Sequence, residues 1–456
     1  MSSGIALYPA LAEQATALAL EAQLGLKDHH GALRHSPLAL LPWQISRDDF
    51  MQAQQVARAI GARLDRLARD NAALAQALGP VLEGRTLQAQ LWQALQSVPL
   101  AQRRARPLNM TRVDLLQDQA RKWKLVEANS IAAGMGPFSE GLAQIQQQLW
   151  PELQRLGLAT QGRPALAANP VTEALGDTLY QAAVGQLRQH PSTHPHAAAP
   201  VVVFVVEPAE DNIFDQRKVA RVVEQKGARV VRLTLQEIDA LLERSLAPAC
   251  HLRGIGPVQV LYFRTGYNLA DFQDAHGRSE RLLRLRAELE TLHVTLAPTI
   301  GLQLASAKAV QVHWYRQPEA DAATEALDTA QFFVADPQVQ DVVNWPQWVL
   351  KSQGEGGGNV VQDEAIPARI ATLSQQERRE WLLMRKIPLV PRQSLVPVLR
   401  NGAIQFAQQL MSELGLFVLG DDVRIGGYLL RSKPVAALET GVHRGQGMID
   451  TVAFSD

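Results

Sequence analysis

A glycine-rich segment at residues 351–359 has the sequence Lys-Ser-Gln-Gly-Glu-Gly-Gly-Gly-Asn and follows the apolar run 348–350. Its glycines allow backbone N–H groups to approach an anion, because no Cβ stands in the way. Lys351 adds a point charge suited to phosphate, and Glu355 is a hard oxygen ligand for the magnesium that accompanies a nucleotide. The segment is typical of a nucleotide-phosphate loop or of a glycine-rich surface hairpin. It matches neither a Walker A loop nor a dinucleotide fingerprint.

Two pairs of polar residues are spaced so that both members fall on one face of a predicted strand. Glu127 and Asn129 lie in the alternating stretch 124–129. There they form either a half-site for a hard cation or a solvent-facing pair on an edge strand. Arg431 and Lys433 repeat the spacing with positive charge. Neither pair identifies a site by itself.

A small parallel α/β lobe is predicted at 200–298. Strand, helix, strand, helix and strand patterns alternate at 201–206, 217–225, 228–233, 238–246 and 258–263. The first run is apolar throughout, as expected for a strand buried on both faces, and Gly227 is placed to cap the first helix. The polar segments 212–217 and 262–267 follow two of these strands. Ligands of α/β folds bind at such carboxyl ends, so a binding crevice is predicted there.

The first 150 residues are predicted to be mainly helical. Apolar residues recur at helical spacing in 50–78, 87–95 and 138–149. Arg112 and Asp114 are predicted to precede the first strand, where they are compatible with an ordinary surface pair. The proline-rich stretch 188–200 contains His190, His194 and His196 but no carboxylate or cysteine. This composition favours a linker over a metal site.

Composition excludes several classes of function. The 456 residues carry 45 basic and 45 acidic side chains, which argues against a nucleic-acid partner held by backbone electrostatics. Cys250 is the only cysteine, so an internal disulfide and a cysteine metal cluster are excluded. No apolar run reaches membrane-spanning length, and residues 1–20 lack a basic region followed by an apolar core. These features predict a soluble, cytoplasmic protein with no membrane partner.

The order of the motifs is more informative than any one of them, because together it resembles the eukaryotic-type glutathione synthetase family. The resemblance runs from about residue 35 to the C-terminus. The matching segments are 37–42, 112–114, 126–131, 212–216, 262–267, 304–311, 350–359, 383–387, 412–415 and 430–433. It implies a mixed α/β (α+β) ATP-grasp fold with a circularly permuted lid, an inserted substrate lobe and a helical N-terminal region. The implied divisions are 1–199, 200–298 and 299–456, with the lid at about 325–400, and the implied assembly is a homodimer.

The resemblance also implies roles for individual residues. Magnesium is implied to bind Glu127, Asn129 and Glu355. ATP is implied to bind Lys308, Lys351, Gly356, Gly357, Gly358, Asn359, Met384, Lys386, Ile387, Glu413, Lys433 and Glu439. Small-molecule substrates are implied to bind Arg112, Glu210, Asn212, Gln216, Arg264, Tyr267, Arg431, Val442 and His443. Arg431 and Arg112 are implied to act catalytically at the reacting carboxylate.

The implied reaction forms an acyl phosphate on γ-glutamylcysteine, which the amine of glycine then attacks to give glutathione. Several positions depart from the family pattern, namely Val113, Ala132, Gly134, Gly354, Val360, Gln362, Arg385, His443 and Arg444. The last two replace a pair of alanines in a loop that closes over the incoming amino acid, at 440–445. Two alternatives therefore stay open: a ligase with a different dipeptide or amine acceptor, and an inactive nucleotide-binding regulatory protein.

Overall fold

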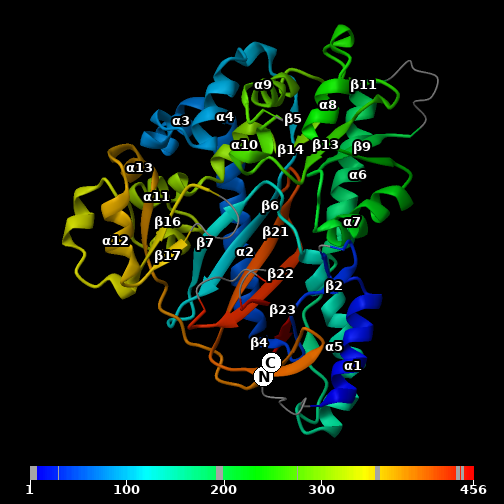
Figure 1. The fold of residues 1–456 in the computed structure, drawn as a ribbon, viewed down its shortest axis with the longest axis vertical. Coiled ribbons are helices and arrows are strands. Elements are labelled where there is room, and N and C mark those ends of the chain that lie inside the picture. The colour runs from blue at the N-terminus through cyan, green and yellow to red at the C-terminus, as the bar shows by residue number, and fades with distance from the viewer. Residues whose placement is uncertain are drawn as a thin grey trace.

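The computed structural model describes residues 8–28, 30–191, 199–274, 276–354, 360–437, 442 and 446–455. Figure 1 shows a long central sheet, a second sheet with its helices beyond one end of it, and a smaller sheet with helices beside it. Within the described residues, no helix combines the length and the apolar character needed to cross a bilayer.

The central sheet has eight strands, and its pairings are antiparallel except for that between β23 and β3. In spatial order the strands are β20 (Ala403–Ala407), β19 (Val396–Arg400), β3 (Leu38–Ala39), β23 (Met448–Asp450), β22 (Arg424–Pro434), β21 (Leu410–Leu419), β6 (Met110–Gln117) and β7 (Trp123–Asn129). Alternation in β21 directs Leu414 and Leu416 to one apolar core and Phe417 to another. The two faces of this sheet are thus buried against different elements.

Helices cover the two faces of the central sheet. Helix α2 (Arg47–Arg69) packs against β21 and β6, where Phe50 meets the ring of Tyr428 edge to face at 5.7 Å. Helix α5 (Gly136–Arg155) packs against β22, and Ser139 accepts a hydrogen bond from the N–H of Leu430 at 3.0 Å. Because α5 covers only part of its face, polar residues farther along the same strands are available to line a cavity.

The second sheet has five strands, all parallel, as predicted for the lobe. Its order is β10 (Arg229–Leu233), β9 (Val201–Val205), β13 (Val260–Phe263), β14 (Thr295–Ala297) and β5 (Arg106–Pro107). The flanking helices are α6 (Val171–Gln189), α7 (Ile213–Gln225), α8 (Leu235–Leu241) and α9 (Glu280–Leu289). Strand β5 and helix α6 come from outside 200–298, so distant parts of the chain complete this lobe.

The third unit is an antiparallel sheet with its own small core. Its order is β15 (Gln331–Phe333), β18 (Leu382–Arg385), β16 (Trp348–Lys351) and β17 (Val360–Gln362). Helices α12 (Ala365–Thr372) and α13 (Gln375–Glu380) accompany it, and Leu350, Ile366 and Leu383 are buried together. Strands β16 and β17 pair as a hairpin in which Lys351 lies opposite Val360. The glycine-rich segment connects these two strands.

The remaining elements pack around these three units. The helices are α1 (Pro9–Glu21), α3 (Asn71–Leu78), α4 (Leu87–Gln96), α10 (Ile300–Ala305) and α11 (Lys308–Arg316). The short strands are β1 (Gly25–Lys27), β2 (Leu33–His35), β4 (Trp43–Ile45), β8 (Ala165–Leu166), β11 (His251–Leu252), β12 (Gly256–Pro257) and β24 (Val452–Phe454). The predicted helix at 50–78 is divided into α2 and α3 by Asp70, which is extended and accepts the N–H groups of Ala72 and Ala73 at 3.0 Å each.

Three sequence predictions need correction. Arg112 and Asp114 do not precede the first strand; they lie inside β6, where the pair is buried and gives the strand the appearance of a polar segment. The helix predicted from residue 217 begins at Ile213. The sequence pattern misses its first turn because Gln216, a polar residue, faces the cavity there and interrupts the apolar periodicity. The helix predicted to reach residue 246 ends at Leu241, and a separate 3₁₀ turn follows at Arg244–Leu246.

Candidate active site

A cavity of about 630 Å³ lies between the central sheet, the carboxyl ends of the parallel strands and the β16–β17 hairpin. It brings together every predicted site residue that the structure describes except Val442. These residues are Arg112, Glu127, Asn129, Glu210, Asn212, Gln216, Arg264, Tyr267, Lys308, Lys351, Met384, Lys386, Ile387, Glu413, Arg431 and Lys433. They come from segments more than 300 residues apart, so only the tertiary fold assembles the site.

Some predicted site residues are not in the cavity or cannot be placed. Val442 is 4 % exposed and belongs to an apolar cluster that includes Leu399 and Ile449. The predicted residues Glu355, Gly356, Gly357, Gly358, Asn359, Glu439 and His443 lie outside the described residues.

Glu127 and Asn129 share one face of β7, as their spacing predicts. The amide Nδ2 of Asn129 donates to Glu127 Oε1 at 3.3 Å, and Lys308 Nζ lies 3.9 Å from Glu127 Oε2. Burial by itself would raise the pKa of Glu127. The charges of Lys308, Lys351, Arg431 and Arg112 outweigh that effect and lower the pKa to about 2. Glu127 is therefore ionised at neutral pH.

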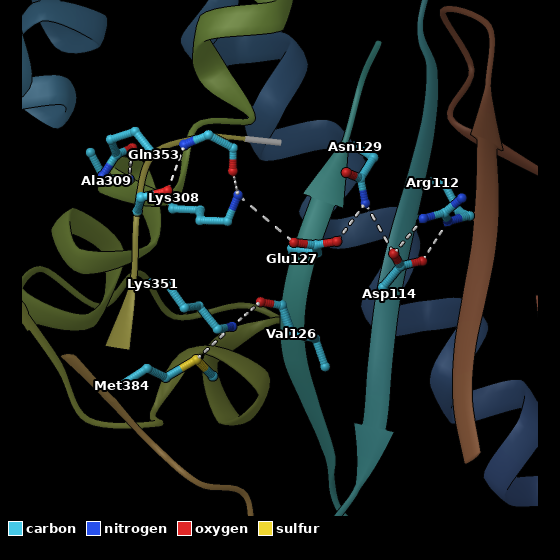
Figure 2. Close-up of polar contacts among 12 residues, drawn as sticks. Arg112, Asp114, Val126, Glu127, Asn129, Lys308, Ala309, Lys351, Gln353 and Met384 are labelled. Atoms are coloured by element: carbon cyan, nitrogen blue, oxygen red, sulfur yellow. Dashed lines mark hydrogen bonds and ion pairs between the residues drawn. The ribbon is translucent and has the colours of Figure 1, made fainter. Parts of the chain in front are cut away.

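Three lysines reach the cavity from three different elements. Lys308 begins α11 and donates to the carbonyl of Gly354 at 3.0 Å, whereas Lys351 ends β16 and lies 3.4 Å from the carbonyl of Val126 (Figure 2). Lys433, in β22, donates to the carbonyl of Ala437 at 2.7 Å. A convergence of ammonium groups of this kind is suited to a polyphosphate.

A buried ion-pair network joins the middle of the central sheet. Arg112 donates from Nε and Nη2 to Asp114 at 2.6 and 2.7 Å, and Arg431 Nη2 lies 3.2 Å from Asp114 Oδ2. Arg431 also forms a short ion pair with Glu413. Burial lowers and the charges of Glu413, Asp114 and Glu127 raise the pKa of Arg431, with the net direction upward. The ion pairs thus hold both guanidinium groups in place at the wall of the cavity.

Another part of the cavity, beside the parallel sheet, combines one buried arginine with carboxylate and amide groups. Arg264 donates to the carbonyl of Ala133 at 2.6 Å and to Asp215 Oδ2 at 3.1 Å. Gln216 Nε2 donates to Glu210 Oε2 at 2.6 Å. Among the described residues, the buried Oδ1 of Asn212 finds no hydrogen-bond partner. Such a group is available to a ligand, because burial without a partner is costly.

Tyr267 is positioned by two carboxylates. Its hydroxyl donates to Glu207 at 3.2 Å, and its backbone N–H is one of three that Asp271 accepts from residues 266–268. Burial raises the pKa of Glu207, and the charge of Asp271 adds to the rise. Together with Asp215 and Glu210, these carboxylates surround this end of the cavity.

The departure at Gly134 has a spatial explanation. A Cβ at this position would lie 2.4 Å from Arg264 Nη2 and 2.8 Å from Asp215 Oδ2. The space that a serine side chain would need is therefore occupied here by the Arg264–Asp215 ion pair. The departures Ala132, Gly354, Val360, Gln362 and Arg385 also line the cavity, whereas Val113 points into the core on the opposite face of β6.

Sequence reasoning missed several residues that hold the site together. Asp114, Asp215, Asp271 and Glu207 each bond a predicted site residue, and Arg232 donates to Gln216 Oε1 at 2.7 Å. Asp114 and Asp215 lie within segments that match the family, 112–114 and 212–216, so the sequence could have identified them as candidate site residues. Arg232 lies in β10, away from any motif, and only the sheet brings it to Gln216.

The donor set of the cavity fits a hard cation. Glu127 supplies an ionised carboxylate, and the Nδ2 of Asn129 faces two carboxylates, which turns its Oδ1 away from both. In the described part of the chain, no group of three acidic, histidine or cysteine side chains forms a complete metal site. Glu127 and Asn129 would hold a magnesium ion jointly with phosphate oxygens, and the metal would screen the charge of the phosphates.

The fold is of the mixed α/β class, and its cavity places three lysines near a region in which one buried arginine lies among carboxylate and amide groups. The model of the family "Eukaryotic glutathione synthase, ATP binding domain" matches residues 7–454, so the chain belongs to this family. As predicted, the protein is therefore an ATP-dependent ligase of the glutathione synthetase type.

Similar proteins extend over nearly the whole chain. A chloroplastic glutathione synthetase of Solanum lycopersicum is 27% identical over 446 residues, covering 92% of this chain and 77% of that protein. The glutathione synthetases of Xenopus laevis and Homo sapiens are each 26% identical, covering 91% of this chain and 89% of theirs. A glutathione synthetase-like effector from Globodera pallida in its apo form has the same fold, with a TM-score of 0.69 at 17% identity, covering 98% of this chain and 96% of that one.

The prediction of a cytoplasmic location is wrong. Similar proteins from Solanum lycopersicum and Arabidopsis thaliana are chloroplastic, so membership of this family does not imply the cytoplasm. The sequence features used for that prediction cannot distinguish proteins of different compartments that share one fold.

Proposed function

We propose that this protein joins the C-terminal carboxylate of γ-glutamylcysteine, that of the cysteine, to the amine of glycine, with ATP and magnesium as cofactors. A carboxylate oxygen of the dipeptide attacks the γ-phosphorus, and ADP leaves with the electron pair of the broken P–O bond. The amine nitrogen of glycine then attacks the acyl carbon. Inorganic phosphate departs, the amine loses a proton, and the product is glutathione.

The observation that carries this proposal is the division of one cavity into two charge environments with two arginines between them. Lys308, Lys351 and Lys433 supply the positive charge that phosphoryl transfer needs. Arg264, with the neighbouring amides and carboxylates, fits a γ-glutamyl group, which carries both an ammonium and a carboxylate. Arg112 and Arg431 stand between these regions, where the carboxylate that accepts phosphate would lie.

Further parts of the proposal concern the metal, the lid and the assembly. Magnesium is assigned to Glu127 and Asn129 together with Glu355, and closure of the hairpin between β16 and β17 excludes water from the acyl phosphate. The lid is assigned to about 325–400, the substrate lobe to 200–298 and the assembly to a homodimer. Light scattering of the purified protein tests the assembly separately from the chemistry.

Phosphate release tests the proposed reaction directly. The protein is incubated with ATP, magnesium and γ-glutamylcysteine, alone and with each of the twenty amino acids, and products are identified by mass. Release that depends on glycine and yields glutathione supports the proposal. A product with another amino acid instead would assign a different acceptor, and the absence of any dependent release would identify an inactive nucleotide-binding protein.

A further inference from the structure

We infer that Asp114 is a positioning residue, which orients Arg112, Asn129 and Arg431 by accepting hydrogen bonds from all three. The chemical roles of those three residues rest on the proposed function, whereas the contacts themselves do not. Asp114 touches neither phosphate nor dipeptide in this scheme. It acts through its neighbours, and its place in β6 puts it between the metal side of the cavity and the carboxylate side (Figure 2).

The contacts of Asp114 connect three strands of the central sheet. Its Oδ1 accepts from Arg112 Nε at 2.6 Å, on its own strand β6. Its Oδ2 accepts from Arg112 Nη2 at 2.7 Å, from Asn129 Nδ2 of β7 at 3.0 Å and from Arg431 Nη2 of β22 at 3.2 Å. The residue is 0% exposed, so water does not compete for these donors.

The contact with Asn129 decides which end of that amide faces the cation. A carboxylate only accepts hydrogen bonds, so Asn129 must direct its NH₂ group to Asp114 and Glu127. Its oxygen is then the atom presented to a metal. An amide at position 114 would remove this constraint, because an amide both donates and accepts hydrogen bonds. The side-chain amide of Asn129 could then flip and exchange the positions of its oxygen and nitrogen.

The contacts with the arginines fix the direction of both guanidinium groups. Arg112 is held by a two-point fork to Asp114, and its Nη1 donates to the carbonyl of Gly134 at 3.2 Å. Among the described residues, both hydrogen bonds of Arg431 use Nη2, toward Asp114 and Glu413. Its Nε and Nη1 are therefore the atoms that can address a reacting carboxylate.

Gly415 provides independent evidence that this arrangement is built into the sheet. It lies opposite Asp114 in β21, and its φ angle is not in the positive range that would require glycine. A Cβ at position 415 would lie 2.4 Å from Asp114 Oδ1 and 2.8 Å from Arg112 Cδ. Glycine in the interior of a strand is unfavourable without such a reason. We conclude that Gly415 is needed for the space that the Asp114–Arg112 pair occupies.

Two variants test the inference, each with a matched control. Asp114→Asn is compared with Asp450→Asn, because Asp450 is also 0% exposed, lies in the same sheet and pairs with an arginine, Arg392, at 3.4 Å. Gly415→Ala disturbs the pair without removing charge. Its control is Gly426→Ala in β22, whose Cβ would meet Leu419 Cδ1 at 2.2 Å. The controls report what strain or loss of a buried charge does to stability alone.

Two readouts separate positioning from stability. The first is the magnesium concentration needed for half-maximal ATP binding, measured by calorimetry, and the second is kcat at saturating substrates. For Asp114→Asn we expect the magnesium requirement to rise and kcat to fall, each roughly 10- to 100-fold, as is usual when a residue that orients a ligand is lost. Gly415→Ala should move kcat in the same direction. Both controls should lower the melting temperature while leaving the magnesium requirement within about threefold of the wild type, the scatter expected for distant sites.

The inference is overturned if Asp114→Asn and Asp450→Asn have the same magnesium requirement and the same kcat. Should Asp114→Asn not fold, the comparison of Gly415→Ala with Gly426→Ala decides the matter, and equal kcat values would overturn it. The binding measurement needs no turnover. A wild-type protein that binds ATP but forms no peptide bond would therefore contradict the proposed function while still testing Asp114.

Discussion

The two ends of the cavity contain similar charged residues but surround their central side chain with charges of opposite sign. At the phosphate end, Glu127 is surrounded by the charges of two lysines and two arginines, which lower its pKa to about 2. At the glutamyl end, burial by itself would lower the pKa of the Arg264 guanidinium, but Tyr262, Asp215 and Glu210 outweigh that effect and raise it. At one end cations outweigh the charge of the Glu127 carboxylate, and at the other end carboxylates surround the buried Arg264.

This difference follows from what each end is proposed to bind. A nucleotide triphosphate with magnesium brings net negative charge, so the protein must supply cations and only enough carboxylate to hold the metal. A γ-glutamyl group is a zwitterion, and it needs one cation for its carboxylate and acceptors for its ammonium. Removing a carboxylate at one end should therefore lower kcat for phosphate release, whereas removing a cation at the other should raise the KM for the dipeptide.

The largest effect is expected from Glu127→Gln, which removes a carboxylate proposed to hold magnesium at the phosphate end. We expect kcat for ATP-dependent phosphate release to fall by at least roughly 100- to 1,000-fold, the cost of losing one preorganised electrostatic contact. Because the folded pKa is about 2, below the ordinary value of 4.5, Glu127 is ionised above about pH 4.5 and begins to protonate only as pH falls toward 2. The ratio of wild-type to variant kcat should accordingly be constant between about pH 5 and 8. A ratio that changes tenfold across this range would contradict the assignment of Glu127 as a permanently charged ligand.

A smaller and more selective effect is expected from Arg264→Met at the glutamyl end. Loss of a hydrogen bond to a charged group costs about 1.5–3 kcal/mol, so the KM for γ-glutamylcysteine should rise roughly 10- to 100-fold. The KM for ATP should change little, because the phosphate end keeps its cations. Arg286→Met is the matched control, since Arg286 is also fully buried, pairs with Glu290 at 3.2 Å and does not line the cavity. Equal changes of both KM values in Arg264→Met would contradict the division of the cavity.

The same two ends show how far sequence reasoning extends. Spacing alone placed Glu127 and Asn129 on one face, since the period of a strand is fixed by its backbone. The alternation between 201 and 263 likewise predicted three neighbouring parallel strands. In both cases the information is local.

Local patterns did not reveal the residues that hold the ligand-binding groups. From the sequence, Arg112 and Asp114 are predicted to precede the first strand, where they are compatible with an ordinary surface pair. The burial of Asp114 depends on β21, about 300 residues later, and on the missing side chain of Gly415. Strand β5 joins the parallel sheet in the same non-local way. The order of the motifs in the sequence identifies the site, whereas the residues that support the site are found only in the three-dimensional structure.

The smallest effect is expected from Arg232, whose influence on the glutamyl end passes through two other residues. Arg232 Nη2 donates to Gln216 Oε1 at 2.7 Å, and an arginine only donates, so the amide of Gln216 must point its NH₂ group at Glu210, 2.6 Å away. Glu210 in turn accepts the N–H of Asn212 at 3.0 Å. In Arg232→Met the side-chain amide of Gln216 is free to flip by 180°. The KM for γ-glutamylcysteine should then rise roughly fivefold, because the loss of one neutral hydrogen bond costs about 1 kcal/mol, and kcat should change little.

Arg229 of the same strand provides the control for that prediction. It is exposed and donates at 3.2 Å to the carbonyl of Ile255, away from the cavity, so Arg229→Met should leave both KM values unaltered. The double variant Arg232→Met with Gln216→Leu sharpens the test, because removal of the amide leaves nothing for Arg232 to orient. Its KM should then match that of Gln216→Leu alone. A double variant in which the two changes add independently would show that Arg232 acts on the dipeptide by its charge and not by holding Gln216.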